Sequence, residues 1–253
     1  MIKLVINNNS DLLDMIVDGV FVKQVNETIN AHADILTPEI MKRTDFKILS
    51  RNALFDGIKS ITENTKSSDR YGVKKLCKLA NEYWKRWGRV DFKAFYIANN
   101  ADDDDDKLVL TKLGIIINES ALASDILSSI GWLDDFIEIM KIDAMHEVGH
   151  IMDYVLSLDG INRVDYLNKV NEENMIEQEH FKWCAEQEKD VYKKTLEERL
   201  EIFKMTDTKY YQLPPELRAD TLAGIDRGKY IDLLYKYEHY SKDKSAKIEP
   251  IDT

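Results

Sequence analysis

Hydrophobic residues recur with helical spacing over most of the chain. The clearest example runs from Ser129 to Leu156, where apolar positions follow one another at intervals that place them on one helix face. These positions are Leu133, Phe136, Ile137, Met140, Ala144, Val148 and Ile151. Similar patterns predict a helix from Ser10 to about Ala33, a short helix that begins at Pro38, and another in residues 71–87. The first ninety residues are therefore expected to be mainly helical.

The pattern changes in the middle of the chain. Val90–Asn99 and Lys107–Asn118 are rich in β-branched and aromatic residues, which predicts two strands. Five consecutive aspartates, Asp102–Asp106, lie between them. Because like charges repel one another and must face water, this run is expected to form the solvated tip of a hairpin. A calcium-binding loop is the alternative, but the run lacks the alternating ligands and the glycine of an EF-hand.

Charged helices are predicted beyond residue 156. Asn171–Met205 is amphipathic but highly charged, which is typical of one or two surface helices. Pro214 and Pro215 open a further helix, and another begins near Lys229. Together the patterns predict an α+β fold that is predominantly helical and contains a small β-sheet. We expect an N-terminal helical region (1–89), a core domain (90–240) and a polar tail (241–253).

The composition is that of a globular protein with an acidic surface. The net charge of −11 argues against nucleic-acid binding as the main task. No apolar run approaches the roughly 18 residues that span a bilayer, and the N-terminus lacks the features of a signal peptide. Cys77 and Cys184 lie far apart, which favours a reducing compartment. We therefore expect a cytoplasmic protein, or a virion-associated one if it is phage-encoded, with no membrane or nucleic-acid partner.

The sequence "HEVGH", from His146 to His150, carries the strongest chemical signal. The two histidines are four residues apart, so both imidazoles lie on one helix face, about 6 Å apart along the axis, and can converge on one metal ion. Glu147 lies beside the first histidine, where its carboxylate could accept a proton from metal-activated water. Gly149 is unfavourable inside a helix, and a backbone packed closely against it would explain its presence. The alternative is a pair of surface histidines that match by chance.

A third protein ligand is expected, because a catalytic zinc usually takes three and leaves one position for water. Glu216 and Asp220 of "PPELRAD" share a helix face, so Glu216 could complete the site while Asp220 accepts a hydrogen bond from a ligating histidine. An ordinary acidic helix start is the alternative for this pair. Asp153 is a weaker candidate because it lies a turn too far along the helix, and His180 and His239 have no supporting pattern.

The motif and its downstream helix resemble the gluzincin metallopeptidases, particularly the small bacterial and phage-type members. These proteins join His-Glu-x-x-His to a later Glu-x-x-x-Asp or Glu-x-x-Ala-Asp helix, here "HEVGH" and "ELRADTLAG". The resemblance covers roughly residues 92–224 and implies a zincin-like core. It also implies a zinc ion held by His146, His150 and Glu216, with Glu147 as the general base and Asp220 orienting a histidine.

Two further features of this resemblance concern the substrate. "LGIIIN", residues 113–118, is similar to the edge strand that aligns a peptide in zincin folds. Lethal-factor-type members place a tyrosine seven residues before the glutamate ligand, where it can stabilise an oxyanion. Here Lys209 occupies that position, and Tyr210 and Tyr211 follow it. Either tyrosine could serve, or both could be core or rim aromatics; Arg218 is a weaker candidate, because it is two residues from Glu216 and points elsewhere.

The function that these patterns predict is zinc-dependent hydrolysis of peptide bonds in a protein or peptide substrate. The alternative is a structural component of a phage virion or another assembly, built on a zincin-like scaffold with or without residual activity. In that case the N-terminal helices would contact other subunits. A nucleic-acid-binding regulator is a third alternative, which the acidic charge and the lack of a basic patch disfavour.

Overall fold

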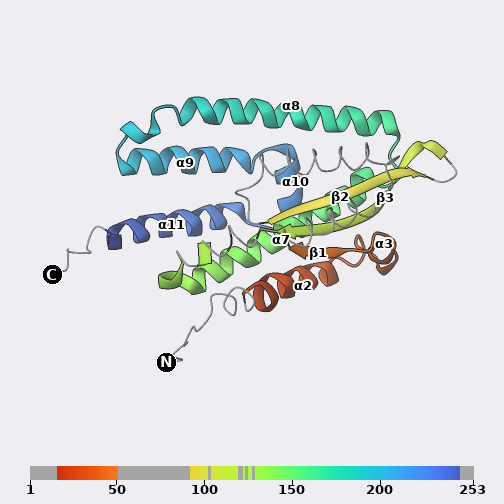
Figure 1. The fold of residues 1–253 in the computed structure, drawn as a ribbon, viewed down its shortest axis with the longest axis horizontal. Helices are drawn as coiled ribbons and strands as arrows, with labels where there is room; N and C mark the ends of the chain where they lie inside the picture. Colours follow the sequence, from red (N-terminus) through yellow and green to blue (C-terminus); the bar gives the residue numbers. More distant parts are fainter. Residues whose placement is uncertain are drawn as a thin grey trace, which may run out of the picture.

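A computed structural model of the chain describes residues 16–50, 92–101, 104–118, 122, 125–126 and 129–245. Within these residues the protein is mostly helical and contains a three-stranded mixed sheet (Figure 1). This confirms the predicted α+β class. The helix predicted in residues 71–87 and the predicted start at Ser10 lie outside the described residues.

The sheet has the strand order β1-β3-β2. β2 (Phe92–Ala101) and β3 (Asp104–Ile117) form an antiparallel hairpin, in which Ala101 is paired with Asp104. The two predicted strands are therefore confirmed. Of the aspartate run predicted as the tip of the hairpin, Asp104–Asp106 belong to β3, and Asp102 and Asp103 lie outside the described residues. β1 (Lys47–Ser50) pairs in parallel with residues 114–117 of β3. This strand was not predicted, because a parallel partner taken from a distant part of the chain leaves no local hairpin signal.

The segment "LGIIIN" does not form an edge strand, so that prediction is wrong. Its residues 114–117 lie in β3 between β1 and β2, and therefore have a hydrogen-bonded neighbour on both sides. β2, on the other side of β3 from β1, contacts the motif helix through the backbone N–H of Ala94. A substrate strand could therefore not pair with "LGIIIN" without displacing β1 or β2.

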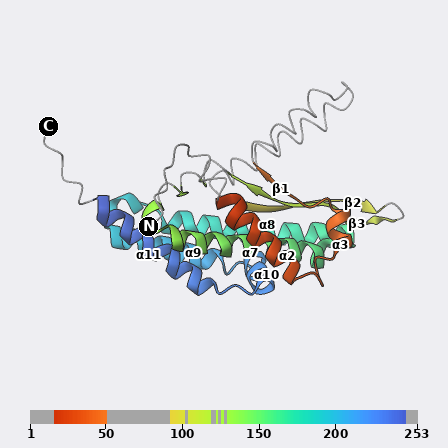
Figure 2. The same cartoon turned by 90° about the horizontal axis from the view of Figure 1, so that it is seen from below.

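A long central helix, α7 (Leu133–Leu158), carries the motif, and a 3₁₀ turn, η3 (Ile130–Trp132), precedes it. These bounds confirm the predicted helix. The sheet lies along one side of the helical layer (Figure 2), and α7 packs against β2 and β3. Their shared core includes Leu110, Leu113, Ile115, Met140, Val148, Ile151 and Met152. The motif is thus on a helix whose position is set by a large buried apolar surface.

The described N-terminal residues belong to the same core. A π-helix, η1 (Val17–Val22), continues into α2 (Lys23–Ala31), and both pack on α7. The ring of Phe21 stacks on that of Phe92, with centroids 4.0 Å apart. α3 (Pro38–Arg43) begins as predicted, with the Thr37 side chain accepting a hydrogen bond from the Ile40 backbone. The boundary expected at residue 89 stays a prediction.

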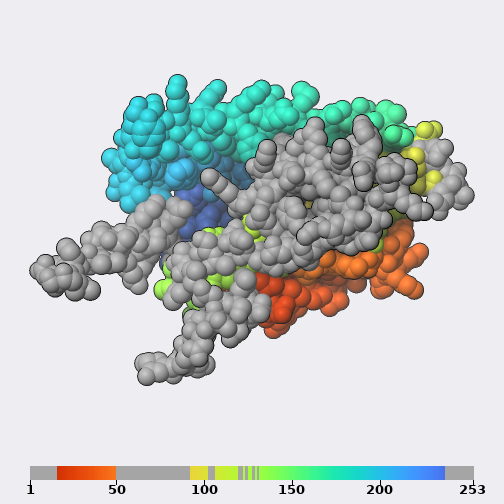
Figure 3. Space-filling view, viewed as in Figure 1, coloured from red at the N-terminus to blue at the C-terminus, as the bar shows by residue number. Residues whose placement is uncertain are grey.

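The C-terminal half supplies four helices around α7. The charged stretch forms α8 (Arg163–Gln187) and α9 (Leu196–Tyr210), which run side by side and are joined through the short turn η4 (Val191–Lys193). α10 (Pro214–Ala223) packs on α7, and α11 (Arg227–Ser245) extends past the predicted start of the tail. In the space-filling view α8 and α9 form one long edge, opposite the described N-terminal residues (Figure 3). None of the described helices combines the length and apolarity that a bilayer crossing requires.

Candidate metal centre

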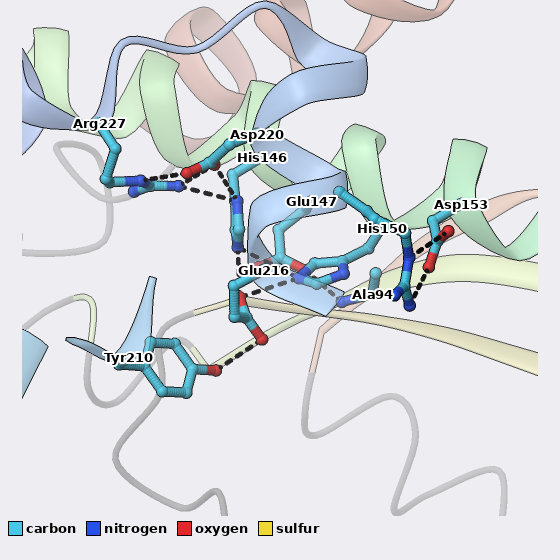
Figure 4. Close-up of polar contacts among 10 residues, drawn as sticks. Ala94, His146, Glu147, His150, Asp153, Tyr210, Glu216, Asp220 and Arg227 are labelled. Atoms are coloured by element: carbon cyan, nitrogen blue, oxygen red, sulfur yellow. Dashed lines mark hydrogen bonds and ion pairs between the residues drawn. The ribbon is translucent and has the colours of Figure 1, made fainter. Parts of the chain in front are cut away.

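Two helices bring three predicted ligands together in the interior. α7 supplies His146 and His150, and α10 supplies Glu216; all three side chains are buried (Figure 4). The Nε2 atom of His146 is 3.1 Å from Nε2 of His150 and 2.9 Å from Oε2 of Glu216. The distance from His150 Nε2 to the same carboxylate oxygen is 3.2 Å. One ligand atom from each residue lies within 4.8 Å of the other two, so the cluster could hold a metal ion.

The absence of a side chain at Gly149 lets the two helices approach. A Cβ at this position would overlap with the backbone carbonyl of Ala219 in α10. Ala219 itself is fully buried and lies between Glu216 and Asp220 in sequence. The glycine therefore allows α10 to lie directly against the motif helix, as expected from its position in the motif.

A second layer of polar side chains supports His146. Its Nδ1 atom lies 2.7 Å from Oδ1 of Asp220, which fits the predicted role of this carboxylate. Arg227 donates from Nε to Oδ2 of Asp220 at 2.8 Å and from Nη2 to Oδ1, and its guanidinium carbon lies 3.8 Å from the ring centroid of Tyr211. Arg227 was not predicted from the sequence. It reaches the site because Gly224 ends α10 in the left-handed conformation and the chain turns into α11.

Glu147 lies beside the triad and does not belong to it. The side chain is buried, and its Oε2 atom accepts a hydrogen bond from the backbone N–H of Ala94 in β2 (Figure 4). This contact joins the motif helix to the sheet and fixes the orientation of the carboxylate. A buried carboxylate next to a metal site, but not used as a ligand, is the arrangement that a general base requires.

The structure places the two tyrosines in different environments. The Tyr210 hydroxyl donates to Oε1 of Glu216 at 2.9 Å, and its ring lines the pocket beside the triad. Burial and the Glu216 carboxylate raise the pKa of Tyr210 well above its usual value, so this hydroxyl keeps its proton at neutral pH. Tyr211 instead packs edge-on against the ring of His146, with centroids 5.9 Å apart, on the side of Arg227.

The electrostatics of the cluster favour a positive charge at the histidines. Burial opposes the ionisation of Glu216, but the two histidines hold its pKa well below its usual value. Arg227 and His146 likewise outweigh burial and lower the pKa of Asp220. Burial alone would lower the pKa of His146, yet hydrogen bonds with Asp220 and Glu216 raise it to about 9. The site thus stabilises a cation, either a proton on His146 or a metal ion in its place.

The other candidates from the sequence lie outside the triad. Asp153 accepts two hydrogen bonds from Arg218, at 2.9 and 3.1 Å, and Arg218 also contacts Glu173. Arg218 therefore points away from the triad, as expected. His180 lies on α8 with its Nε2 atom 3.2 Å from Cys184 Sγ. The side chain of His239 lies outside the described residues.

A pocket of about 220 Å³ opens beside the triad. His150 and Glu216 form part of its wall, so a molecule in the pocket would lie next to the ligand atoms. Its other walls come from β2, the C-terminal half of α7, α8 and the segment that leads into α10. Comparison of the chain with protein-family models, with curated proteins and with solved structures gives no match.

Proposed function

We propose that the protein is a zinc-dependent peptidase of the gluzincin type, with a zincin-like core. The observation that carries the proposal is the buried His146, His150 and Glu216 cluster, with the carboxylate of Glu147 beside it. The contact between Asp220 and Nδ1 of His146 supports the same conclusion, because a ligating histidine usually donates a hydrogen bond from its second ring nitrogen to a carboxylate. The residues present therefore fit a catalytic metal ion with an open coordination position.

Zinc is the metal that this donor set suits best. Two imidazoles and one carboxylate form the usual ligand set of several zinc peptidases, although non-haem iron(II) oxygenases use a similar set. Glu147 favours the hydrolytic assignment, because a fourth buried residue with a fixed carboxylate has a direct use in proton transfer. When bound, zinc would supply a lowered pKa for water and a polarised substrate carbonyl.

The side chains of this chain have separate tasks in the proposed reaction. Glu147 accepts a proton from the attacking water, whose oxygen forms the new bond to the peptide carbonyl carbon. Glu147 then gives that proton to the leaving amine as the C–N bond breaks, which releases a carboxylic acid and an amine. The acid passes its proton to the amine, so the final products are a carboxylate and an ammonium group. The Tyr210 hydroxyl retains its proton, and it would donate to the oxyanion as it forms by turning away from its present acceptor, Oε1 of Glu216. Asp220 keeps His146 in the orientation that points Nε2 into the site.

The experiment compares Glu147→Gln with Glu138→Gln, the same change at a half-exposed position of the same helix. Both variants and the wild type are analysed for bound metal and for cleavage of a fluorogenic peptide mixture. We expect zinc in all three proteins and hydrolysis in all but Glu147→Gln. Equal turnover by Glu147→Gln and the wild type would contradict the proposal. Zinc without hydrolysis in the wild type would support a structural role in an assembly instead.

A further inference from the structure

The pocket beside the triad is a groove with two unlike walls. One wall is built from α7 and β2 and presents the rings of Tyr154 and Tyr96, whose centroids are 4.7 Å apart. The facing wall is α8, which presents Val170, Asn174 and Glu177. These three residues follow the helical repeat, so they lie on the same face of α8. The triad lies at one end, through His150 and Glu216.

The position of α8 depends on polar contacts more than on apolar packing. α8 is described over its full length, Arg163–Gln187, and His180 is its one buried residue. A helix with so little buried apolar surface needs other contacts to hold it in place. The Tyr96 and Tyr166 hydroxyls, 3.1 Å apart, connect it to β2 near one end.

Arg218 supplies a second connection, in the middle of α8. Its guanidinium binds both carboxylate oxygens of Asp153 on α7 and reaches Glu173 on α8 with its Nη2 atom, at 2.5 Å. Three helices thus meet at one side chain. Because Arg218 is two residues from Glu216, this connection links α8 to the helix that supplies the third ligand.

Asn174 is the residue that follows Glu173, and its side chain lines the groove. An amide carries both a donor and an acceptor, which matches the N–H and C=O groups of a peptide backbone. The described part of the chain provides no hydrogen-bond partner for this amide. A peptide in the groove would provide both partners.

We propose that α8 is the substrate-binding wall of the groove: Asn174 binds the backbone of a peptide, and the Arg218–Glu173 pair positions it. The proposal rests on the proposed peptidase function and deepens it by naming a residue that contacts the substrate and a residue pair that positions the wall. Asn174 is a contact residue, whereas Arg218 and Glu173 act through the position of α8. The aromatic wall formed by Tyr96 and Tyr154 then faces the substrate from the other side.

The test uses zinc-loaded protein and two hydroxamates. Acetohydroxamate reaches only the metal, whereas the hydroxamate of a blocked dipeptide also fills the groove. Asn174→Ala is compared with Asn171→Ala, an exposed position of the same helix, and Glu173→Gln with Glu172→Gln. Glu173→Gln leaves the Asp153–Arg218 pair intact, so it releases α8 without stranding a buried charge. Hydrogen exchange of the α8 amides is measured in the second pair.

We expect Asn174→Ala to weaken the dipeptide probe by about two- to tenfold, the effect of one lost hydrogen bond, and to leave acetohydroxamate unaffected. Glu173→Gln should weaken the same probe and accelerate exchange in α8, while both control variants behave as the wild type. Equal affinities of Asn174→Ala and Asn171→Ala for the dipeptide probe would overturn the proposal, as would unchanged exchange in Glu173→Gln. If zinc does not bind, the proposed function fails, and this inference fails with it. If zinc binds but Asn174→Ala changes the affinities of the two hydroxamates equally, only this inference fails.

Discussion

Replacing Gly149 with alanine adds one methyl group at the closest contact between α7 and α10. The new Cβ would lie much closer to the carbonyl oxygen of Ala219 than van der Waals contact allows. This oxygen belongs to the backbone, so it cannot rotate away. Relief requires α10 to move, by a distance on the order of 1 Å. Glu216 and Asp220 lie on either side of Ala219, so both move with it. The substitution therefore acts on the metal centre without touching a ligand.

The magnitude follows from two opposing effects. Overpacking a tight interface typically costs about 1–3 kcal/mol, whereas glycine to alanine in a helix gains up to about 1 kcal/mol. We expect a net loss of about 0–3 kcal/mol in the free energy of unfolding. Metal binding is more sensitive, because ligand distances must hold within about 0.2 Å. We expect zinc affinity to fall by about 10–100-fold, as when a supporting partner of a ligand is lost.

The assay is a zinc competition titration, with a denaturant unfolding curve of each metal-free protein. Gly19→Ala is the matched control, because Gly19 is also inside a helix and a Cβ there has no atom within 4 Å. This control should be neutral or stabilised and should bind zinc as the wild type does. Wild-type zinc affinity in Gly149→Ala would refute the argument that this glycine positions α10.

Four further predictions concern the same site. Asp220→Ala should weaken zinc binding by about 10–100-fold, measured by competition titration, whereas the exposed Asp226→Ala should not. Zinc affinity should rise up to about tenfold per pH unit until about pH 9, because the metal displaces a proton from His146, whose pKa is raised above 6.5; a flat profile from pH 7 to 9 would contradict this. Because the pKa of His146 is raised, its imidazolium should also stabilise the metal-free protein. This stabilisation should be complete below pH 6.5 and lost as the pH rises to about 9, and unfolding curves at several pH values can detect the loss. Chelation should lower the free energy of unfolding by about 4 kcal/mol when free zinc had been at 1,000 times its Kd, and re-addition of zinc should restore it.

Local geometry explains which parts of the site could be predicted from the sequence. His146 and His150 are four residues apart on one helix, so helical periodicity alone places both imidazoles on one face. Glu216 is 66 residues beyond His150, and no periodicity relates the two. This ligand was predicted from its four-residue spacing to Asp220 together with the family resemblance. Arg227 had no such signal, because its contact with Asp220 depends on how α11 leaves the turn at Gly224.

The sheet shows the same limit. The hairpin of β2 and β3 was predictable from two apolar segments on either side of a charged run, since both partners are neighbours in sequence. The position of β1 was not predictable, because a parallel pair joins segments that are far apart in the chain, and the sequence of one does not identify the other. The error about "LGIIIN" follows directly, because the place of a strand within a sheet depends on its partners and not on its own residues.

The charge balance of the centre predicts that the cluster forms without a bound metal ion. Glu216 and Asp220 are buried carboxylates, and unpaired they would oppose folding. Arg227 neutralises one of these charges through Asp220, and a proton on His146 offsets the other in the metal-free protein. Under the proposed function, a zinc ion would therefore replace a proton in this cluster, while α7 and α10 remain held by their apolar core and by the contact at Gly149. This distinguishes the site from small zinc domains that are unfolded without metal, and it makes metal-free protein a sound reference state for each titration above.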